Sequence, residues 1–256
     1  MLKQRIIIGD IHGCFDELCL LLESIPFNPS TDQLISVGDV IGKGPQVRKC
    51  LQLLYFYKAL VIKGNHELWY LKNNIDIHPN FRSKTSLSPS SQEEISSAPS
   101  VFSEKSLYIS YKKIMDSTKF SHSSFGKQLS DQELATWIHS WPLYLEYPDL
   151  YIVHAGLDPR SGIPQESSSK ILTQIRHWDG KGINLNNETD PAWFDCFLPQ
   201  KKVVFGHWAK KGLIQKSSFI GIDSGCVYGN SLSAYCPEQD QIWQVKALKS
   251  YVQIGH

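Results

Sequence analysis

Two features that would assign a protein class at once are missing from this sequence. The longest largely apolar stretch, residues 50–62, contains Lys58 and is shorter than the roughly 18 residues that suggest a membrane-spanning helix. The 26 Lys and Arg residues nearly balance the 25 Asp and Glu residues, giving a formal net charge of +1. Neither a basic field for nucleic acid nor an acidic excess typical of disorder is present. We expect a soluble chain that contacts neither a membrane nor an extended nucleic acid.

The sequence also lacks paired cysteines and a secretory signal. Its six cysteines are scattered without a C-x-x-C pair, which favours reduced thiols over a disulfide framework. The start of the chain has only a short apolar run, residues 6–8, before a polar motif, unlike a signal peptide. We expect a cytoplasmic protein; export by a route without such a signal stays the alternative. Cys14, Cys226 and Cys236 are expected to be packing residues, although Cys14 would also suit a redox switch.

Short β-rich runs alternate with amphipathic helices in the first quarter of the chain. The spacing of apolar residues predicts strands at 5–9, 34–38 and 60–63, and helices at 15–25 and 46–57. Repeated β-α-β units are typical of a mainly parallel sheet covered by helices. A chain of 256 residues is long enough for one large domain, and we expect a single domain over residues 1–256.

The composition changes in the middle of the chain and then becomes ordered again. Ser, Pro, Thr and Glu dominate residues 83–106, which predicts a flexible surface insertion. Ser130 and Glu133 then form a capping-box signature for a helix to about residue 139. Further short strands are predicted at 150–153, 203–206, 219–222, 231–235 and 242–245.

A glycine-flanked polar cluster follows five of the predicted strands. The clusters are Gly9-Asp10-Ile11-His12-Gly13, Gly38-Asp39-Val40-Ile41-Gly42-Lys43-Gly44, Gly64-Asn65-His66-Glu67, His154-Ala155-Gly156 and Gly206-His207-Trp208. Ligand sites in open α/β sheets gather at the carboxyl ends of strands, so these clusters are expected to meet. Imidazole and carboxylate groups are ligands that divalent transition metals accept. The sequence therefore predicts a metal-dependent hydrolytic centre.

In order and spacing these clusters resemble the motifs of the phosphoprotein-phosphatase-like metallophosphoesterases: GD-x-HG, GD-x(4)-G, GNH-E/D, HAG and GH. Residues 205–209 and 221–229 are similar to the bacterial symmetrical diadenosine tetraphosphatases and the related ApaH-like phosphatases, while Trp141-Pro142-Leu143 and Ile175-Arg176 look closer to the ApaH-like branch. The resemblance covers nearly the whole chain outside the insertion. It implies an α/β fold, the calcineurin-like metallophosphoesterase sandwich of two mixed β-sheets flanked by helices.

The resemblance also implies ligands for two divalent metal ions. One ion would be bound by Asp10 and His12, the other by Asn65, His154 and His207, and both by the bridging carboxylate of Asp39. A water held between two ions ~3.5–4 Å apart has its pKa lowered toward about 7 and can attack a phosphate group in line. Such a donor set suits manganese, our first expectation, and also accommodates iron, zinc or cobalt.

Three further residues receive roles by the same resemblance. His66 would protonate the leaving oxygen, and Lys43 and Arg176 would hold the non-bridging phosphate oxygens. The chain departs from the protein-phosphatase pattern at two positions. Gly42 stands where an aspartate would orient the catalytic histidine, although the diadenosine tetraphosphatases also have a small residue there. Lys43 replaces an arginine, so a point charge takes the place of a planar fork.

The expected function is hydrolysis of a phosphoanhydride or phosphoester, with a dinucleoside polyphosphate as leading substrate and a bis(5'-nucleosyl)-tetraphosphatase (symmetrical) as the enzyme type. The alternatives are a phosphoprotein phosphatase acting on Ser, Thr or Tyr phosphate, a polyphosphatase, and a binding module that keeps only the phosphatase fold. Trp208 and Tyr228 would either stack on a nucleobase or pack in the core. Loss of a metal ligand would mark the binding module, and no ligand is missing.

Overall fold

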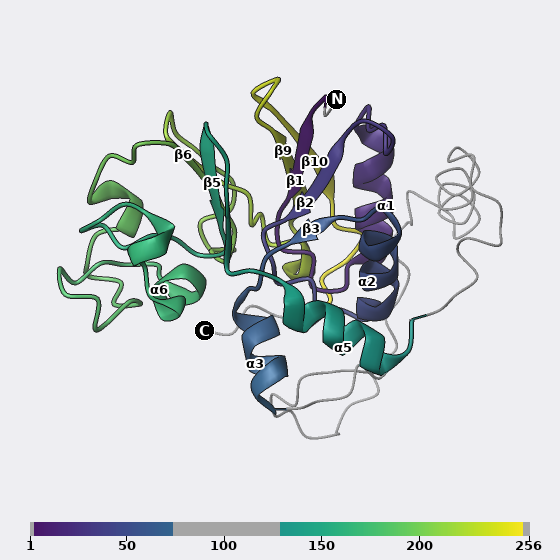
Figure 1. The fold of residues 1–256 in the computed structure, drawn as a ribbon, viewed down its shortest axis with the longest axis horizontal. Coiled ribbons are helices and arrows are strands. Elements are labelled where there is room, and N and C mark those ends of the chain that lie inside the picture. Colours follow the sequence, from purple (N-terminus) through teal and green to yellow (C-terminus); the bar gives the residue numbers. More distant parts are fainter. Residues whose placement is uncertain (1–2, 74–128, 253–256) are drawn as a thin grey trace.

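Two five-stranded β-sheets lie face to face in the computed structural model of this chain, which describes residues 3–73 and 129–252 (Figure 1). The first sheet has the strand order β10 (Gln241–Lys246), β9 (Ser231–Cys236), β1 (Arg5–Ile8), β2 (Gln33–Ser36) and β3 (Leu60–Val61). Strands β1, β2 and β3 are parallel, and β9 runs antiparallel to both of its neighbours. Helices α1 (Phe15–Ser24) and α2 (Val47–Phe56) connect the parallel strands, so the predicted β-α-β alternation is present.

The second sheet also combines a parallel centre with antiparallel edges. Its strand order is β4 (Tyr144–Glu146), β5 (Leu150–Val153), β6 (Lys202–Phe205), β8 (Phe219–Gly221) and β7 (Ile214–Gln215). Strands β5, β6 and β8 are parallel, and β4 and β7 are antiparallel to their neighbours. The fold is therefore the expected calcineurin-like sandwich of two mixed sheets with helices.

The remaining α-helices of the described chain are α3, α5 and α6. Helix α3 (Asn65–Asn73) follows β3, and α5 (Asp131–Ser140) begins at Ser130, where the predicted capping box is formed with Glu133. Helix α6 (Ser169–Gln174) and the 3-10 turns Pro164–Glu166 and Trp193–Asp195 lie between β5 and β6, and the 3-10 turn Cys226–Tyr228 follows β8.

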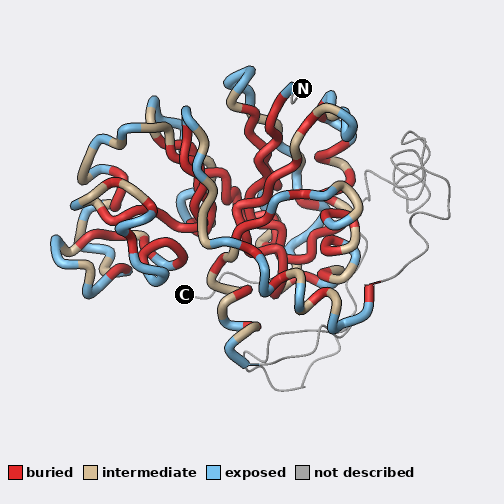
Figure 2. The backbone as a smooth tube through the Cα atoms, in the orientation of Figure 1, coloured by how far each residue is buried: buried red, intermediate tan, exposed pale blue. Residues whose placement is uncertain are grey.

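Alternating residues of the strands face two different cores. On β1, Ile7 points to the core between the sheets, while Ile6 and Ile8 face helices α1 and α2. On β5, Ile152 points to the core between the sheets and Val153 to the outer face. This two-residue period is what a sheet buried on both faces requires. Figure 2 shows the result as continuous buried stretches along the strands of both sheets.

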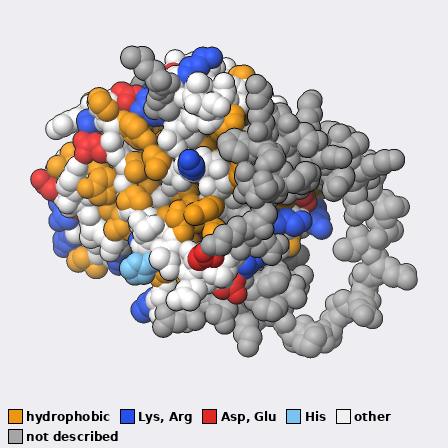
Figure 3. Space-filling view, turned by 45° about the vertical axis from the view of Figure 1, so that its right-hand side comes forward, with side chains coloured by type: hydrophobic (Ala, Val, Ile, Leu, Met, Phe, Trp, Pro, Cys, Tyr) orange, Lys and Arg blue, Asp and Glu red, His pale blue; other side chains and the backbone are white. Residues whose placement is uncertain are grey.

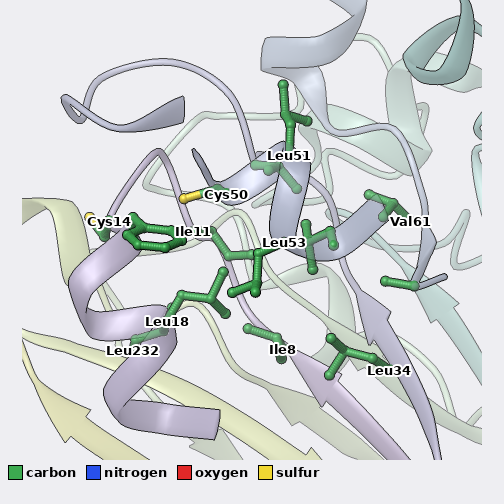
Figure 4. Packing of buried hydrophobic residues seen from close by; sticks show 14 of the residues in the cluster. Ile8, Ile11, Cys14, Leu18, Leu34, Cys50, Leu51, Leu53, Val61 and Leu232 are labelled. Carbon is green, nitrogen blue, oxygen red and sulfur yellow. The ribbon is translucent and has the colours of Figure 1, made fainter. Parts of the chain in front are cut away.

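The outer face of the first sheet is closed by α1 and α2. Leu18 of α1 and Leu51 and Leu53 of α2 are fully buried in the same core cluster as Ile8 of β1 (Figure 4). Each such side chain contributes roughly 1.5–3 kcal/mol when it is removed from water. This packing fixes the ends of β1 and β2, where two of the polar clusters begin.

The sequence also led to expectations about membrane-spanning helices, surface charge and the insertion at 83–106. No helix within the described ranges is long and apolar enough to cross a membrane. On the face shown in Figure 3, Lys and Arg side chains stand singly or in small groups among apolar and neutral atoms. The insertion expected at 83–106 lies outside the described residues, and the single-domain organisation stays a prediction.

Candidate metal centre

A polar cavity of about 400 Å³ opens at the carboxyl ends of the parallel strands of both sheets. Eight of the nine residues singled out in the sequence line it: Asp10, His12, Asp39, Lys43, Asn65, His66, Arg176 and His207. The ninth, His154, has no exposed surface and lies directly behind the cavity wall, 3.5 Å from the Asp39 carboxylate. The structure therefore brings the whole predicted set together.

Five of the six predicted metal ligands follow the ends of five different strands. Asp10 comes after β1, Asp39 after β2 and Asn65 after β3, all in the first sheet. His154 directly follows β5, and His207 follows β6, in the second sheet. Because both sheets contribute parallel strands whose carboxyl ends meet, the two halves of the centre come from opposite layers of the sandwich.

The backbone of this cavity is strained. His12, Asp39, Lys43 and His207 have φ values of 45°, 49°, 56° and 68°, in the left-handed region that non-glycine residues rarely adopt. They account for four of the six such residues among those described. Each costs about 1–3 kcal/mol, a cost that proteins tend to carry at functional sites. Hydrogen bonds between the loops, such as His12 N–H to the Asp39 carbonyl at 2.8 Å, help to hold these conformations.

Asp39 is common to two groups of potential metal ligands. His12, Asp39 and His66 form one group, and Asp39, His154 and His207 the other; within each group the ligand atoms lie within 4.8 Å of one another. The two carboxylate oxygens are used differently. Oδ2 lies 3.5 Å from His12 Nε2, and Oδ1 lies 3.5 Å from His154 Nε2. A carboxylate placed in this way can contact two ions at once.

The second group is completed by the side chain of Asn65. Its Oδ1 lies 3.1 Å from His154 Nε2 and 3.0 Å from His207 Nδ1. Nδ1 of His154 donates to the Val37 carbonyl at 2.8 Å. In the same way, Nδ1 of His12 donates to the Ile41 carbonyl at 3.0 Å. A carbonyl only accepts hydrogen bonds, so Nδ1 carries the proton in both rings and the Nε2 lone pair faces the cavity.

Charge and burial favour the cation-binding form of three donor groups, Asp39, His12 and His207. Burial disfavours ionisation of Asp39, but the neighbouring imidazoles, His154 first, outweigh it and lower its pKa. Burial lowers the pKa of His12 and of His207, which favours neutral imidazoles. Neutral imidazole and ionised carboxylate are the ligand forms of these side chains.

Asp223 is a cavity residue that the sequence analysis missed as a site residue. It follows β8 and lines the cavity together with Asp10. Burial raises the pKa of both carboxyls, and the charge of Asp223 raises that of Asp10 further. Bound divalent cations would offset this repulsion, so the donor set fits metal ions. A sixth strand end with a carboxylate, Gly221-Ile222-Asp223, was the signal available in the sequence.

Glu67 holds the loops of the first sheet together. Its fully buried carboxylate accepts hydrogen bonds from the backbone N–H groups of Asp39 (2.8 Å), Ile41 (3.0 Å) and Gly64 (2.8 Å). The loop after β2 and the loop after β3 are therefore tied to the same side chain. The sequence shows Glu67 within the third motif, but its burial and its three donors are visible only in the structure.

Two cations extend into the cavity beside the ligand groups. Lys43 Nζ lies 3.1 Å from His12 Nε2 and 5.1 Å from the ring centre of Tyr228. Burial opposes its charge, but Asp39 and Tyr228 outweigh burial and raise the pKa of Lys43. Arg176 donates from Nη1 to Asn186 Oδ1 at 3.0 Å and from Nη2 to the His207 carbonyl at 3.3 Å. Both cations are held where an anionic group could approach the centre.

His66 lies on the edge of the centre, 3.9 Å from Asp39 Oδ2 through its Nε2. Its backbone N–H donates to Asp39 Oδ1 at 3.0 Å, and the ring faces Gly42. A Cβ atom at position 42 would stand only 2.5 Å from His66 Nδ1, and Gly42 has φ +88°. Glycine at this position therefore leaves room for the imidazole ring.

Known proteins with a similar sequence define the family. The family model described as calcineurin-like phosphoesterase matches residues 5–211, well over half of the chain. The chain is a calcineurin-like phosphoesterase. A curated symmetrical bis(5'-nucleosyl)-tetraphosphatase of Aliivibrio fischeri is 30% identical to this phosphoesterase, over 94% of the chain and 98% of that protein. One of Vibrio campbellii is 28% identical, again over 94% of the chain and 98% of that protein. The phosphoesterase is therefore a hydrolase.

Solved structures agree with this family. A crystal structure of a protein with the provisional name diadenosine tetraphosphatase superposes with a TM-score of 0.70 at 25% identity, covering 96% of the phosphoesterase and 95% of that chain. A protein serine/threonine phosphatase from Saccharomyces cerevisiae superposes with a TM-score of 0.53 at 16% identity, covering 95% of the phosphoesterase and 79% of that chain. The second likeness shows the fold alone.

Proposed function

We propose that the phosphoesterase is a two-metal hydrolase that cuts dinucleoside tetraphosphates symmetrically. Asp10 and His12 bind one ion, Asn65, His154 and His207 bind the other, and Asp39 binds both. The observation that carries this proposal is that two groups of ligand atoms share the Asp39 carboxylate. Manganese is our first choice of metal, because these nitrogen and oxygen donors accept it.

The side chains around the ligands would act on the phosphate chain. When bound, two divalent ions acidify a water and neutralise phosphate oxygens. Lys43 and Arg176 place positive charge on the remaining oxygens of the phosphate that is attacked. His66 faces the cavity on the side of Asp39 and would donate its proton to the leaving phosphate oxygen. The strained loops hold these groups ready, so little reorganisation accompanies the reaction.

The choice of substrate rests on the relatives and on the form of the cavity. Curated relatives at 28–30% identity are named symmetrical bis(5'-nucleosyl)-tetraphosphatases. The cavity extends beyond the ligand groups along Asn186, Glu188 and Lys210, which leaves space for more than one phosphate. Trp208 is only 5% exposed and contacts the His177 ring edge-on at 4.9 Å, so it packs in the wall and does not offer an open face to a nucleobase. Tyr228 lines the cavity beside Lys43.

Product analysis tests this function directly. Purified enzyme with Mn²⁺ is mixed with diadenosine tetraphosphate, with polyphosphate and with a set of Ser, Thr and Tyr phosphopeptides, and the products are separated by chromatography. Symmetrical cleavage consumes one water and gives ADP as the sole nucleotide product. Formation of AMP and ATP, or turnover of phosphopeptides or polyphosphate with none of the dinucleotide, would contradict the proposed substrate.

A further inference from the structure

A second cluster of potential metal ligands lies outside the cavity, in the core next to the loop that follows β1. It consists of Cys14, Glu17 and Cys226, and we call it the thiol site. Cys14 is the residue before α1, Glu17 is in the first turn of α1, and Cys226 begins the 3-10 turn after β8. One ligand atom from each lies within 4.8 Å of those of the other two. None of the three lines the cavity.

The three side chains are enclosed by protein. Cys14 and Cys226 are each 1% exposed, and Glu17 is fully buried. Figure 4 shows Cys14 among the apolar side chains between α1 and the first sheet. A carboxylate in such surroundings requires partners, because an isolated buried charge is strongly disfavoured. Two thiols and a carboxylate brought together from two distant parts of the chain are therefore an unusual core composition.

The partners of Glu17 leave one of its oxygens less occupied than the other. Oε1 accepts from Leu248 N–H and from the Tyr251 hydroxyl, both at 3.0 Å, whereas Oε2 has only the longer contact to the same hydroxyl at 3.2 Å. A carboxylate can accept hydrogen bonds and bind an ion at the same time. Oε2 is thus the oxygen available for a third ligand bond.

The two thiol groups lie within 4.8 Å of each other and of this carboxylate. The contact with Cys14, together with burial, raises the pKa of the Cys226 thiol. A divalent ion that displaces both thiol protons brings in two positive charges while two protons leave. The net charge of the buried cluster therefore stays the same, and the exchange adds no uncompensated charge to the core.

We propose that Cys14, Glu17 and Cys226 form a binding site for a thiophilic divalent ion of the zinc class. Two sulfur ligands and one oxygen ligand select such an ion over manganese or magnesium, which prefer oxygen donors. The site binds by M²⁺ + 2 RSH → M(SR)₂ + 2 H⁺, with Glu17 as third ligand, so no oxidant or reductant takes part. This inference does not depend on the proposed function of the cavity.

An ion in the thiol site would connect the loop after β1, which carries Asp10 and His12, to the end of the described chain. Cys14 follows His12 in the loop after β1, and Cys226 precedes Val227, whose carbonyl accepts from Tyr251 N–H at 2.9 Å. Tyr251 in turn donates to Glu17. Binding to the folded state alone stabilises that state, so the ion would raise the thermal midpoint of unfolding.

Cadmium is the probe that separates the thiol site from the cavity. Thiolate bound to Cd²⁺ gives an ultraviolet charge-transfer band, whereas the nitrogen and oxygen donors of the cavity give none. Titration of the Mn²⁺-loaded protein with Cd²⁺ is expected to produce this band to a limit of one ion per chain, with release of two protons per ion. Cys14→Ala and Cys226→Ala should each lose most of the band. Cys236→Ala, at another buried thiol of the same core, should keep it.

A second readout uses the unchanged protein, in case an alanine variant fails to fold. The Cd²⁺-saturated and Cd²⁺-free proteins are alkylated with a small thiol reagent under partly unfolding conditions, and the modified peptides are quantified. We expect Cd²⁺ to protect Cys14 and Cys226 and to leave Cys236 unprotected. Absence of the band, a band that both folded alanine variants retain, or alkylation of Cys14 and Cys226 that Cd²⁺ does not change would overturn the proposal.

Discussion

The residues of the cavity combine strained backbone with limited space, and Gly42 shows both. Its φ of +88° suits glycine, and a Cβ there would stand 2.5 Å from His66 Nδ1. The protein-phosphatase pattern has an aspartate at this position, yet the present geometry has no room for one unless the His66 ring moves. The proposed general acid His66 thus has no carboxylate partner at position 42.

We predict that Gly42→Asp lowers activity and does not improve it. The new side chain displaces the His66 ring and strains the backbone, so kcat falls at least about 10-fold, part of the ~10²–10⁴-fold that a general acid contributes. Gly180→Asp is the matched control, because Gly180 also has positive φ (+78°) but nothing lies within 4 Å of its added Cβ. Steady-state kinetics of both variants decide the matter, and a kcat at or above wild type in Gly42→Asp would refute the steric argument.

Lys43 supplies a positive charge beside the ligand groups, with its Nζ 3.1 Å from His12 Nε2. We predict that Lys43→Met lowers kcat/KM by about 10²-fold, in the range found when one preorganised charge-stabilising group is removed. Lys216→Met serves as control, since Lys216 is exposed and paired with Asp195 away from the cavity. An equal, small effect of the two substitutions on kcat/KM would show that Lys43 does not bind phosphate.

Among the structural elements, the loops after β2 and β3 depend on one side chain at the start of α3. Glu67 accepts three backbone N–H groups from these loops. Glu67→Gln replaces one acceptor oxygen with an NH2 group, a donor that cannot accept from the backbone N–H groups facing it. We predict a loss of about 1–3 kcal/mol in the free energy of unfolding and weaker activation by Mn²⁺, because Asp39 is no longer fixed.

The control for Glu67 is another glutamate near a helix start. Glu133 closes the capping box of α5 on the surface, and its replacement by Gln should cost at most about 1 kcal/mol. Its activation by Mn²⁺ should equal that of wild type. Denaturant unfolding and Mn²⁺ titration of activity measure both effects, and identical Mn²⁺ curves for the two variants would contradict the positioning role of Glu67.

The sequence predicted elements with a clear apolar period better than elements without one. Strand β1 and helices α1 and α2 carry clear apolar periods, and their predicted bounds differ from the observed ones by at most one residue at each end. The strands β4 and β7 and helix α6 were not predicted, because no clear apolar period marks them in the sequence. These elements form through contacts with the edges of the second sheet.

The same limit applies to the site. Motif order and the family resemblance named nine residues that the fold brings to one place; eight of them follow strand ends, and Arg176 follows helix α6. Asp223 was missed although it directly follows the strand predicted at 219–222, whereas the hydrogen-bond role of Glu67 depends on which loops lie side by side. Periodicity does not report such contacts between distant segments.

On the scale of the whole molecule, Arg5 joins the two sheets. From β1 its guanidinium pairs with Asp149, next to β5, at 2.6 Å and with Glu238, in the β9–β10 turn, at 2.6 Å. Hydrogen bonds from Arg5 lower the pKa of Asp149, and for Glu238 they outweigh burial and lower its pKa too. The stability that these carboxylates contribute is present above their unfolded pKa values, about 4, and is lost as pH falls through the lower folded values.

We predict that Arg5→Met lowers the free energy of unfolding by about 1–3 kcal/mol at pH 7, where both carboxylates are charged. The difference from wild type should shrink as the pH is lowered below 4, because the wild-type pairs are then protonated. Urea unfolding at several pH values measures it. A difference that stays constant down to pH 3 would mean that packing of the Arg5 stem, not its charge, joins the sheets.

The central claim is a two-metal centre that depends on the shared carboxylate of Asp39, and Asp39→Asn tests it most directly. Metal analysis and turnover of diadenosine tetraphosphate are measured together, with circular dichroism as the test of folding. We predict two divalent ions per wild-type chain, and in the folded variant a reduced metal content with turnover lowered by at least about 100-fold. A folded Asp39→Asn protein with wild-type metal content and wild-type turnover would contradict the account.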